Sequence, residues 1–379
     1  MLNRKTFSFA LLLGALLFCF TSIHAQGCVA IRGGSACGTA FGNSFNLSRG
    51  EANLLAGYRH FKSFRHFRGS AEEPERLEHG TEVINRSSFL DLGINYGITD
   101  RWYASAVVPV VFHHRSSMYE HGGNPPGGLG ERHATSSRGL ADVRLGVGYW
   151  LFDPAKHSFN YSIALGVKLP TGKYDYTDTF YHQGDDRSQT LEAVVDQSIQ
   201  PGDGGTGLSV ELQGFQPLGH SLGLTANLFY LVNPRETNGV LTRNGRSEFS
   251  CPDQFAARIG GYYATMSGFS AYLGGRLEGV PAQDLVGGSA GYRRPGYAIS
   301  AEPGVGYTRG GWSVFASVPV ALYRNRTQSF EDKVRTQQTG TFTQGDAAFA
   351  DYLLSVGVSY RFGGQATAPT PLPVQHDVF

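Results

Sequence analysis

The chain has 379 residues and a formal net charge of +1, so it lacks the basic excess that is typical of nucleic-acid-binding proteins. It contains 51 glycines and 12% aromatic residues but only 3 methionines. Beyond the N-terminus no run of about eighteen apolar residues occurs, which excludes a helical membrane protein.

The N-terminus has the features of a secretory signal. A basic pair precedes the apolar run from Phe7 to Phe20, and Ala25 offers a small residue for cleavage. We therefore expect residues 1–25 to be a signal peptide. Two alternatives fit less well, because the run is short for a membrane anchor and the residues before Cys28 make a poor lipoprotein signal.

Residues 26–48 form a glycine-rich segment without clear alternation, which we expect to be a periplasmic arm or a plug inside the fold. Cys28 and Cys37 are close enough in sequence to close a disulfide loop in an oxidising compartment. Cys251 is then left over, and we interpret it as a free thiol or an alternative disulfide partner in a loop.

Twelve segments alternate between apolar and polar residues with the period of a β-strand. In chain order they are 51–61, 89–98, 102–112, 141–149, 159–169, 207–215, 222–232, 254–264, 269–279, 298–307, 312–323 and 352–362. In the clearest pair, between Gly139 and Gly172, the predicted outward residues of the first strand are Ala141, Val143, Leu145, Val147 and Tyr149. Strands of about ten residues with one apolar face suit a membrane barrel, since only a closed sheet satisfies every backbone group in lipid.

The sequence therefore predicts an all-β fold, a transmembrane antiparallel up-and-down β-barrel of about twelve strands, over residues 49–362, followed by a periplasmic tail at 363–379. The connections after the even-numbered strands are short and those after the odd-numbered strands are long. This asymmetry is typical of bacterial outer-membrane barrels, with long loops outside and both chain ends in the periplasm.

Inward positions of the predicted strands carry charges of both signs in nearly equal number. These lumen-facing candidates are Asp91, Asp142, Arg144, Lys168, Glu211, Arg258, Arg276, Glu278, Glu302, Asp351 and Arg361. Balanced charges across a narrow interior form a salt-bridged wall or contact a passing solute, and the sequence leaves both roles open.

The remaining motifs do not predict a metal, a cofactor or a catalytic residue. Eight histidines occupy loops or strand ends without the spacing of a metal motif: His60, His66, His79, His113, His114, His121, His133 and His182. The aspartates of the loop 171–205, among them Asp203, have irregular spacing for calcium. The segment 287–291 matches a nucleophile elbow only in its letters, because no helix follows it.

Two prolines occupy similar contexts. Residues 102–110 read WYASAVVPV and residues 312–320 read WSVFASVPV, which suggests that the two strands lie at equivalent depth with each proline toward the loop end.

Three stretches carry a resemblance to a known family. They are GLADVRLG at 139–146, LPTGK at 169–173 and PGDGGTG at 201–207. On these the chain resembles the transporter-like outer-membrane proteins named for the meta pathway of phenol degradation. The resemblance implies a porin-like outer-membrane barrel for small molecules, with hydrophobic or aromatic compounds as the class, and it carries over no catalytic residue.

We therefore expect a passive channel or transporter in the bacterial outer membrane. A structural or surface-interaction barrel is the alternative, and a barrel hydrolase fits less well because no His-x-Ser pair falls on a predicted strand. The expected partners are outer-membrane lipid, the barrel-assembly machinery and a small solute that the sequence does not identify, and no nucleic acid.

Overall fold

The computed structural model describes residues 46–363 and forms a closed antiparallel barrel of twelve wall strands. The expected signal peptide, nearly all of the segment 26–48 and nearly all of the tail 363–379 lie outside the described residues. The wall strands are β1 (Glu51–Arg68), β3 (Ile84–Gly97), β4 (Trp102–Ser117), β5 with β6 (His133–Leu140 and Arg144–Trp150), β7 (Asn160–Lys168), β10 (Gly207–Pro217), β11 (Leu222–Val232), β14 (Gln254–Ala264), β15 (Phe269–Val280), β16 (Gly296–Arg309), β17 with β18 (Trp312–Ser317 and Val320–Arg326) and β19 (Ala347–Gly363).

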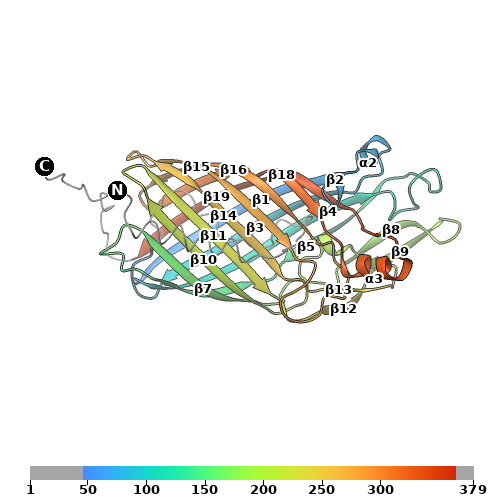
Figure 1. Cartoon of the computed structure of the whole chain (residues 1–379), viewed down its shortest axis with the longest axis horizontal. Coiled ribbons are helices and arrows are strands. Elements are labelled where there is room, and N and C mark those ends of the chain that lie inside the picture. Colours follow the sequence, from blue (N-terminus) through green and yellow to red (C-terminus); the bar gives the residue numbers. More distant parts are fainter. Residues whose placement is uncertain (1–45, 364–379) are drawn as a thin grey trace.

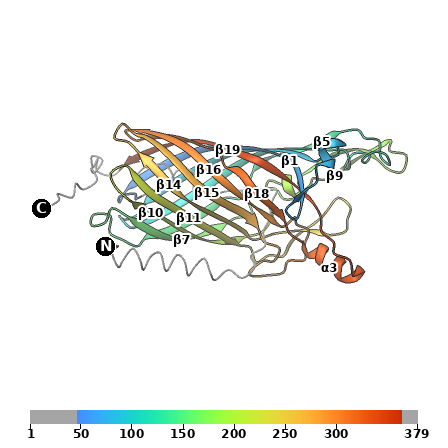
Figure 2. The same cartoon turned by 45° about the horizontal axis from the view of Figure 1, so that its top comes forward.

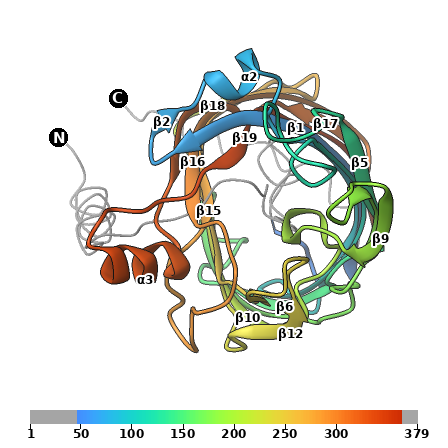
Figure 3. The ribbon, with the colours of Figure 1, turned by 90° about the vertical axis from the view of Figure 1, so that its right-hand side faces the viewer.

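Each wall strand pairs with its neighbours in sequence, and β19 pairs with β1 to close the ring. The closing register places Ala56 opposite Val358 and Glu51 opposite Gly363. The strands are tilted to the long axis of the barrel in Figure 1, and Figure 3 shows the ring from one end. The predicted fold class is confirmed, and each of the twelve predicted segments overlaps one wall strand.

The long connections gather at one end of the barrel, which we call the loop end, and the short ones at the other, the turn end (Figures 1 and 2). The loop end carries elements that alternation alone did not predict: β2 (Ala71–Glu72), α2 (Glu75–Glu78), β8 (Thr177–Gln183), β9 (Gln189–Val194), η2 (Gln197–Ile199), β12 (Thr237–Leu241), β13 (Glu248–Ser250) and α3 (Phe330–Thr339). Several wall strands also extend farther toward this end than predicted; β1 continues to Arg68, for example, and β19 begins at Ala347. None of the helices in residues 46–363 has the length and hydrophobicity needed to cross a membrane.

The outer face of the wall is apolar. Leu165 on β7 is 64% exposed and Leu273 on β15 is 66% exposed, although both lie in the middle of strands. At the turn end, exposed tryptophans pack against tyrosines of the neighbouring strand, with ring centroids 4.7 Å apart for Trp102 and Tyr149. An apolar belt with aromatic residues at its edge is the surface that a membrane barrel presents to lipid.

One prediction about the faces is wrong, and proline is part of the reason. The wall strand formed by β5 and β6 is interrupted opposite Pro109 of β4, and the register with β4 shifts by one residue there, from Val110 opposite Leu140 to Val107 opposite Arg144. Because Pro109 has no N–H, it cannot complete the ladder, and its carbonyl accepts a bond from the N–H of Ala141 at 2.8 Å instead. Ala141 was predicted to face outward, but it is 1% exposed and packs on the inside.

The second proline has a similar effect on another strand. Pro319 separates β17 from β18, while its carbonyl still accepts a bond from the N–H of Leu353 at 3.1 Å. Trp102 and Trp312 both begin their strands at the turn end, so the two similar sequences do lie at equivalent depth.

The faces can be tested with a charge placed on either side of the wall. Leu165→Arg should cost roughly 2–4 kcal/mol of folding free energy in lipid, because the cation enters the hydrocarbon. Ser209 on β10 lies beside Gly166 in the wall and faces inward, so Ser209→Arg is the matched control and should fold nearly normally. The folded fraction of each variant can be measured by folding into vesicles, followed by heat-modifiable gel mobility. A larger loss of folded protein in Ser209→Arg than in Leu165→Arg would mean that the faces are reversed.

The orientation can be tested with cysteine labels. A cysteine at Asn244, in the β12–β13 turn of the loop end, should react with a membrane-impermeant maleimide on intact cells, whereas one at His220, in the β10–β11 turn, should not. The parent protein, whose Cys251 is buried, gives the background. Labelling at His220 alone would contradict the expectation that the long loops lie outside.

Candidate functional site

Alternation predicts eleven charged side chains on the inner face of the wall. All eleven are buried or half-buried, next to exposed apolar residues of the same strands: Asp91, Asp142, Arg144, Lys168, Glu211, Arg258, Arg276, Glu278, Glu302, Asp351 and Arg361. The structure brings them together in separate groups, each completed by side chains from neighbouring strands or loops.

The largest group joins β14, β15 and β16. The guanidinium of Arg258 donates to both oxygens of Glu302, at 2.7 and 2.8 Å, and Glu302 is fully buried. Arg276 lies 3.8 Å from Glu302 and 2.8 Å from Glu278. Ser317 donates a further hydrogen bond of 3.0 Å to Glu302. Two cations and two anions therefore neutralise one another on the wall, as buried charges require.

A second group includes a residue that the sequence analysis missed. Arg59 of β1 donates to Asp91 of β3 at 2.6 and 3.2 Å, and its guanidinium also lies over the ring of Phe89, 4.6 Å from the centroid. Arg59 occupies an inward position of β1, but the alternation of that strand is imperfect because the half-buried Leu55 faces inward as well. The sequence could nevertheless have predicted Arg59, because residues two apart on a strand share a face and Phe61 faces inward.

A third group ties a long connection to the wall. Lys168 of β7 is 2% exposed, forms a short ion pair with Asp203 and lies 3.7 Å from Asp142. Asp142 accepts hydrogen bonds from the N–H groups of Gly172 and Asp203, at 3.0 and 3.2 Å. A side chain at Gly202 would meet the oxygen of Gly172 at 2.4 Å, so this crossing of the connection requires glycine. Asp203, one of the aspartates of the loop 171–205, is thus held against the wall by Lys168.

The remaining predicted charges contact side chains of other wall strands, which are neighbours in the sheet except for β6 and β14, joined by Arg144 and Gln254. They are Asp351 with Arg65 at 2.7 Å and Arg324 at 2.6 Å, Glu211 with Asn227 at 2.5 Å, Arg144 with Gln254 at 3.3 Å, and Arg361 with Glu51. At the turn end, Arg361 also donates to the carbonyl of Asn46 at 2.8 Å, and the side chain of Asn46 accepts from Asn160 at 3.4 Å. Asn46 therefore links β19 to β7 across the inside of the barrel.

An apolar band on the inner wall was not predicted. Phe61, Phe89, Val111, Ala141 and Leu353 pack together, each no more than 5% exposed. They come from β1, β3, β4, the β5–β6 break and β19, which follow one another around the wall. In register, Phe61 lies opposite Leu353 and Phe89 lies opposite Val111. The band is therefore a continuous apolar strip at one depth.

Inward aromatic rings elsewhere lie flat against glycines. A Cβ atom at Gly148 would meet the ring of Tyr103 at 2.2 Å, and one at Gly357 would meet the ring of Phe315 at 2.3 Å. The hydroxyl of Tyr103 is held by Ser162 at 3.1 Å and by Gln213 at 2.8 Å. These glycines let large rings cover the wall closely, as in other curved sheets.

At the loop end the connections fold over the barrel and are held by buried ion pairs. Asp196 forms a two-pronged pair with Arg294, 2.7 Å for each bond, and lies 3.6 Å from Arg115 of β4. Burial alone would raise the pKa of Asp196, but the guanidinium groups of Arg115 and Arg294 hold that pKa well below its ordinary value. Arg293 and Asp284 form another pair at 2.6 Å, with both side chains fully buried.

No protein-family model matches the chain. Among solved structures, the chain is similar to an outer membrane channel from Pseudomonas putida F1, with a TM-score of 0.56 and 13% sequence identity, over 85% of this chain and 98% of that one. It is also similar to a FadL homologue from Pseudomonas aeruginosa, with a TM-score of 0.43 and 9% identity over 82% and 90% of the two chains. For the toluene transporter TodX of P. putida the values are 0.40 and 12%, over 84% and 91%. The first of these likenesses shows that this chain has the β-barrel fold of an outer membrane protein.

Proposed function

We propose that the protein is a passive channel of the bacterial outer membrane for small hydrophobic molecules. The observation that carries this proposal is the apolar band of Phe61, Phe89, Val111, Ala141 and Leu353 on the inner wall. The inner wall of a barrel that conducts only hydrophilic solutes has no need of a continuous apolar strip. Because the side chains of the band are packed closed, each no more than 5% exposed, a hydrophobic solute would reach them by moving them apart, and it would then make apolar contacts without desolvating a charge.

The inner charges support the same proposal by their arrangement. Arg258 and Glu302, like Arg59 and Asp91, satisfy each other at hydrogen-bond distance and are largely buried. Paired charges leave little net field to attract an ionic solute. We therefore propose that the eleven predicted charges chiefly hold the shape of the wall, and that the apolar band contacts the solute.

The resemblance to the phenol meta-pathway proteins supports a hydrophobic or aromatic class of solute, and the neighbour TodX is itself named as a toluene transporter. In this proposal the barrel is exported by the signal at residues 1–25 and inserted by the barrel-assembly machinery. Its outward apolar face contacts outer-membrane lipid, and residues 26–48 serve as an arm or plug. Transport of this kind needs no catalytic residue.

A surface-interaction barrel is the second candidate, because the loop end carries two hairpins and a well-capped helix. In α3, Ser329 and Asp332 form a reciprocal capping box, and Gly340 ends the helix in the left-handed conformation. Ordered loops of this kind would suit a binding surface as well as a channel mouth.

Uptake through the apolar band can be measured directly. A hydroxyl that is buried against an apolar solute without a hydrogen-bond partner costs roughly 1 kcal/mol, which corresponds to about a fivefold lower rate of uptake. Val111→Thr should therefore slow toluene uptake into proteoliposomes by about fivefold, with little change in arabinose uptake. Val108→Thr, on the outer face of the same strand, is the matched control and should behave like the parent.

Two results would oppose the channel proposal. Equal slowing of toluene and arabinose in Val111→Thr would mean that the band only supports the wall. Failure of the folded parent protein to pass either solute above the rate of empty vesicles would favour the surface-interaction barrel.

The structural role of the charges has its own test. Arg258→Met leaves Glu302 buried beside Arg276, and breaking a buried pair typically costs about 3–5 kcal/mol. We expect urea unfolding in lipid to show such a loss, and Arg258→Met combined with Glu302→Leu to recover part of it. Unchanged stability in Arg258→Met, together with altered ion selectivity in planar bilayers, would instead assign these charges to solute contact.

A further inference from the structure

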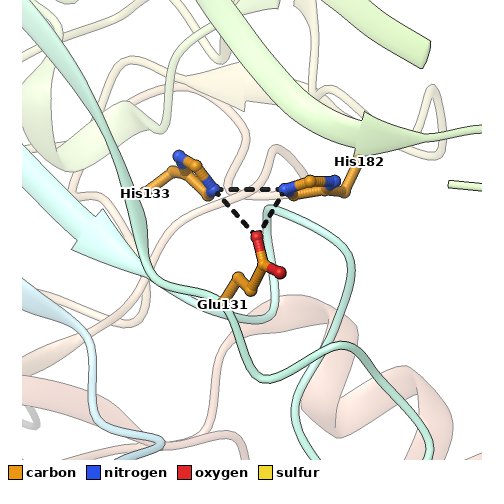
Figure 4. Close-up of side chains that lie close together, drawn as sticks. All are labelled: Glu131, His133 and His182. Carbon is orange, nitrogen blue, oxygen red and sulfur yellow. Dashed lines mark hydrogen bonds and ion pairs between the residues drawn. The ribbon is translucent and has the colours of Figure 1, made fainter. Parts of the chain in front are cut away.

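Three side chains with metal-binding atoms meet at the loop end (Figure 4). Glu131 lies in the β4–β5 connection, His133 is the first residue of β5, and His182 lies on β8. The Nε2 atoms of His133 and His182 are 3.2 Å apart. An oxygen of Glu131 lies 2.9 Å from Nε2 of His182 and 3.7 Å from Nε2 of His133. We propose that these residues form a binding site for a divalent transition-metal ion, with Zn²⁺ as the best match.

The spacing of the three atoms is that of a tetrahedral zinc site. Bonds of about 2.0–2.1 Å in tetrahedral geometry place neighbouring ligand atoms about 3.3 Å apart. The three separations, 2.9, 3.2 and 3.7 Å, lie around this value. Two imidazole nitrogens with one carboxylate oxygen suit Zn²⁺ better than Ca²⁺ or Mg²⁺, which prefer oxygen ligands. The fourth position is left for water.

The local fold of β8 points the side chain of His182 toward Glu131 and His133. The pairing of β8 with β9 is irregular between Phe180 and Gln183, and His182 itself has a φ of 55°, a conformation that is uncommon outside glycine. Its Nδ1 donates to the carbonyl of Arg187 at 3.3 Å, and in that tautomer the lone pair of Nε2 faces Glu131 and His133. Metal-binding histidines are commonly oriented by a bond of this kind from the other ring nitrogen.

Contacts that need no metal ion already hold the β4–β5 connection against the β8–β9 hairpin. The ring of His133 stacks on Tyr181 with centroids 4.8 Å apart. The N–H of Tyr181 donates to Nδ1 of His121 at 3.1 Å, and Arg187 donates to the carbonyl of Gly127 at 2.6 Å. The site is therefore preorganised, so an ion need not order the loops in order to bind.

The carboxylate of Glu131 is 59% exposed and supplies a negative charge next to solvent. An ion bound here would connect the β4–β5 connection to the β8–β9 hairpin.

Zinc binding can be tested on the folded full-length protein in detergent, after treatment with a chelator. Titration with ZnCl₂ in a calorimeter should show saturable binding of one ion. X-ray absorption should show nitrogen or oxygen neighbours at about 2.0–2.1 Å and no sulfur at about 2.3 Å, which separates this site from any cysteine. His133→Ala and His182→Asn should each weaken binding by more than about tenfold, since even the loss of an outer partner commonly costs that much.

The variants are chosen so that folding does not confuse the result. Asparagine tolerates the left-handed backbone of position 182, and Glu131→Gln changes only an exposed side chain. His79→Ala, at an exposed position after α2, is the matched control and should bind zinc like the parent. Heat-modifiable mobility shows that each variant is folded. Parent-like zinc affinity in folded His133→Ala and His182→Asn, or no saturable binding by the parent, would overturn the proposal.

Discussion

The structure depends on the closure of β19 onto β1. Inside a membrane, an N–H or C=O group without a partner costs several kcal/mol, so a sheet can cross lipid only when no edge remains. Closure also brings together side chains from opposite ends of the chain. Arg361 pairs with Glu51, 310 residues away, and Arg65 pairs with Asp351, 286 residues away. The ring is thus sealed by its backbone and by ion pairs across the same seam.

Closure decides what the inner face must accommodate. Every second residue points inward, so a charge there loses water and must find a partner on a nearby strand. Glu302 of β16 pairs with Arg258 of β14 across the intervening β15, and Asp91 of β3 pairs with Arg59 of the adjacent β1. Where the inward residues are apolar, they pack on one another and produce the apolar band. Both kinds of contact stiffen the wall, but the band runs across five successive wall strands without a charge, which is why the proposed function rests on it.

The two proline sites show how a small departure from the regular ladder changes a face. Pro109 lies opposite a one-residue bulge, and the bulge turns Ala141 from lipid to the inside. Because Ala141 extends the strip beyond Val111, the irregularity contributes to the candidate site. At the loop end, freedom from the ladder allows hairpins and short helices, and there residues distant in sequence, such as His133 and His182, come within 3.2 Å.

The sequence by itself determined the strands and most of their faces. Successive side chains of a strand point to opposite faces, and the face toward lipid must be apolar, so apolar residues recur at every second position. The sequence also determined the candidates for inward charge, such as Glu302 and Lys168. Only the tertiary structure decided which of them pair, since partners such as Asp203 for Lys168 come from a connection with no periodicity. The apolar band was decided in the same way: Phe61 and Leu353 become neighbours only when the barrel closes. Local pattern specifies the direction of a side chain, but its neighbours depend on register and closure, which are properties of the whole chain.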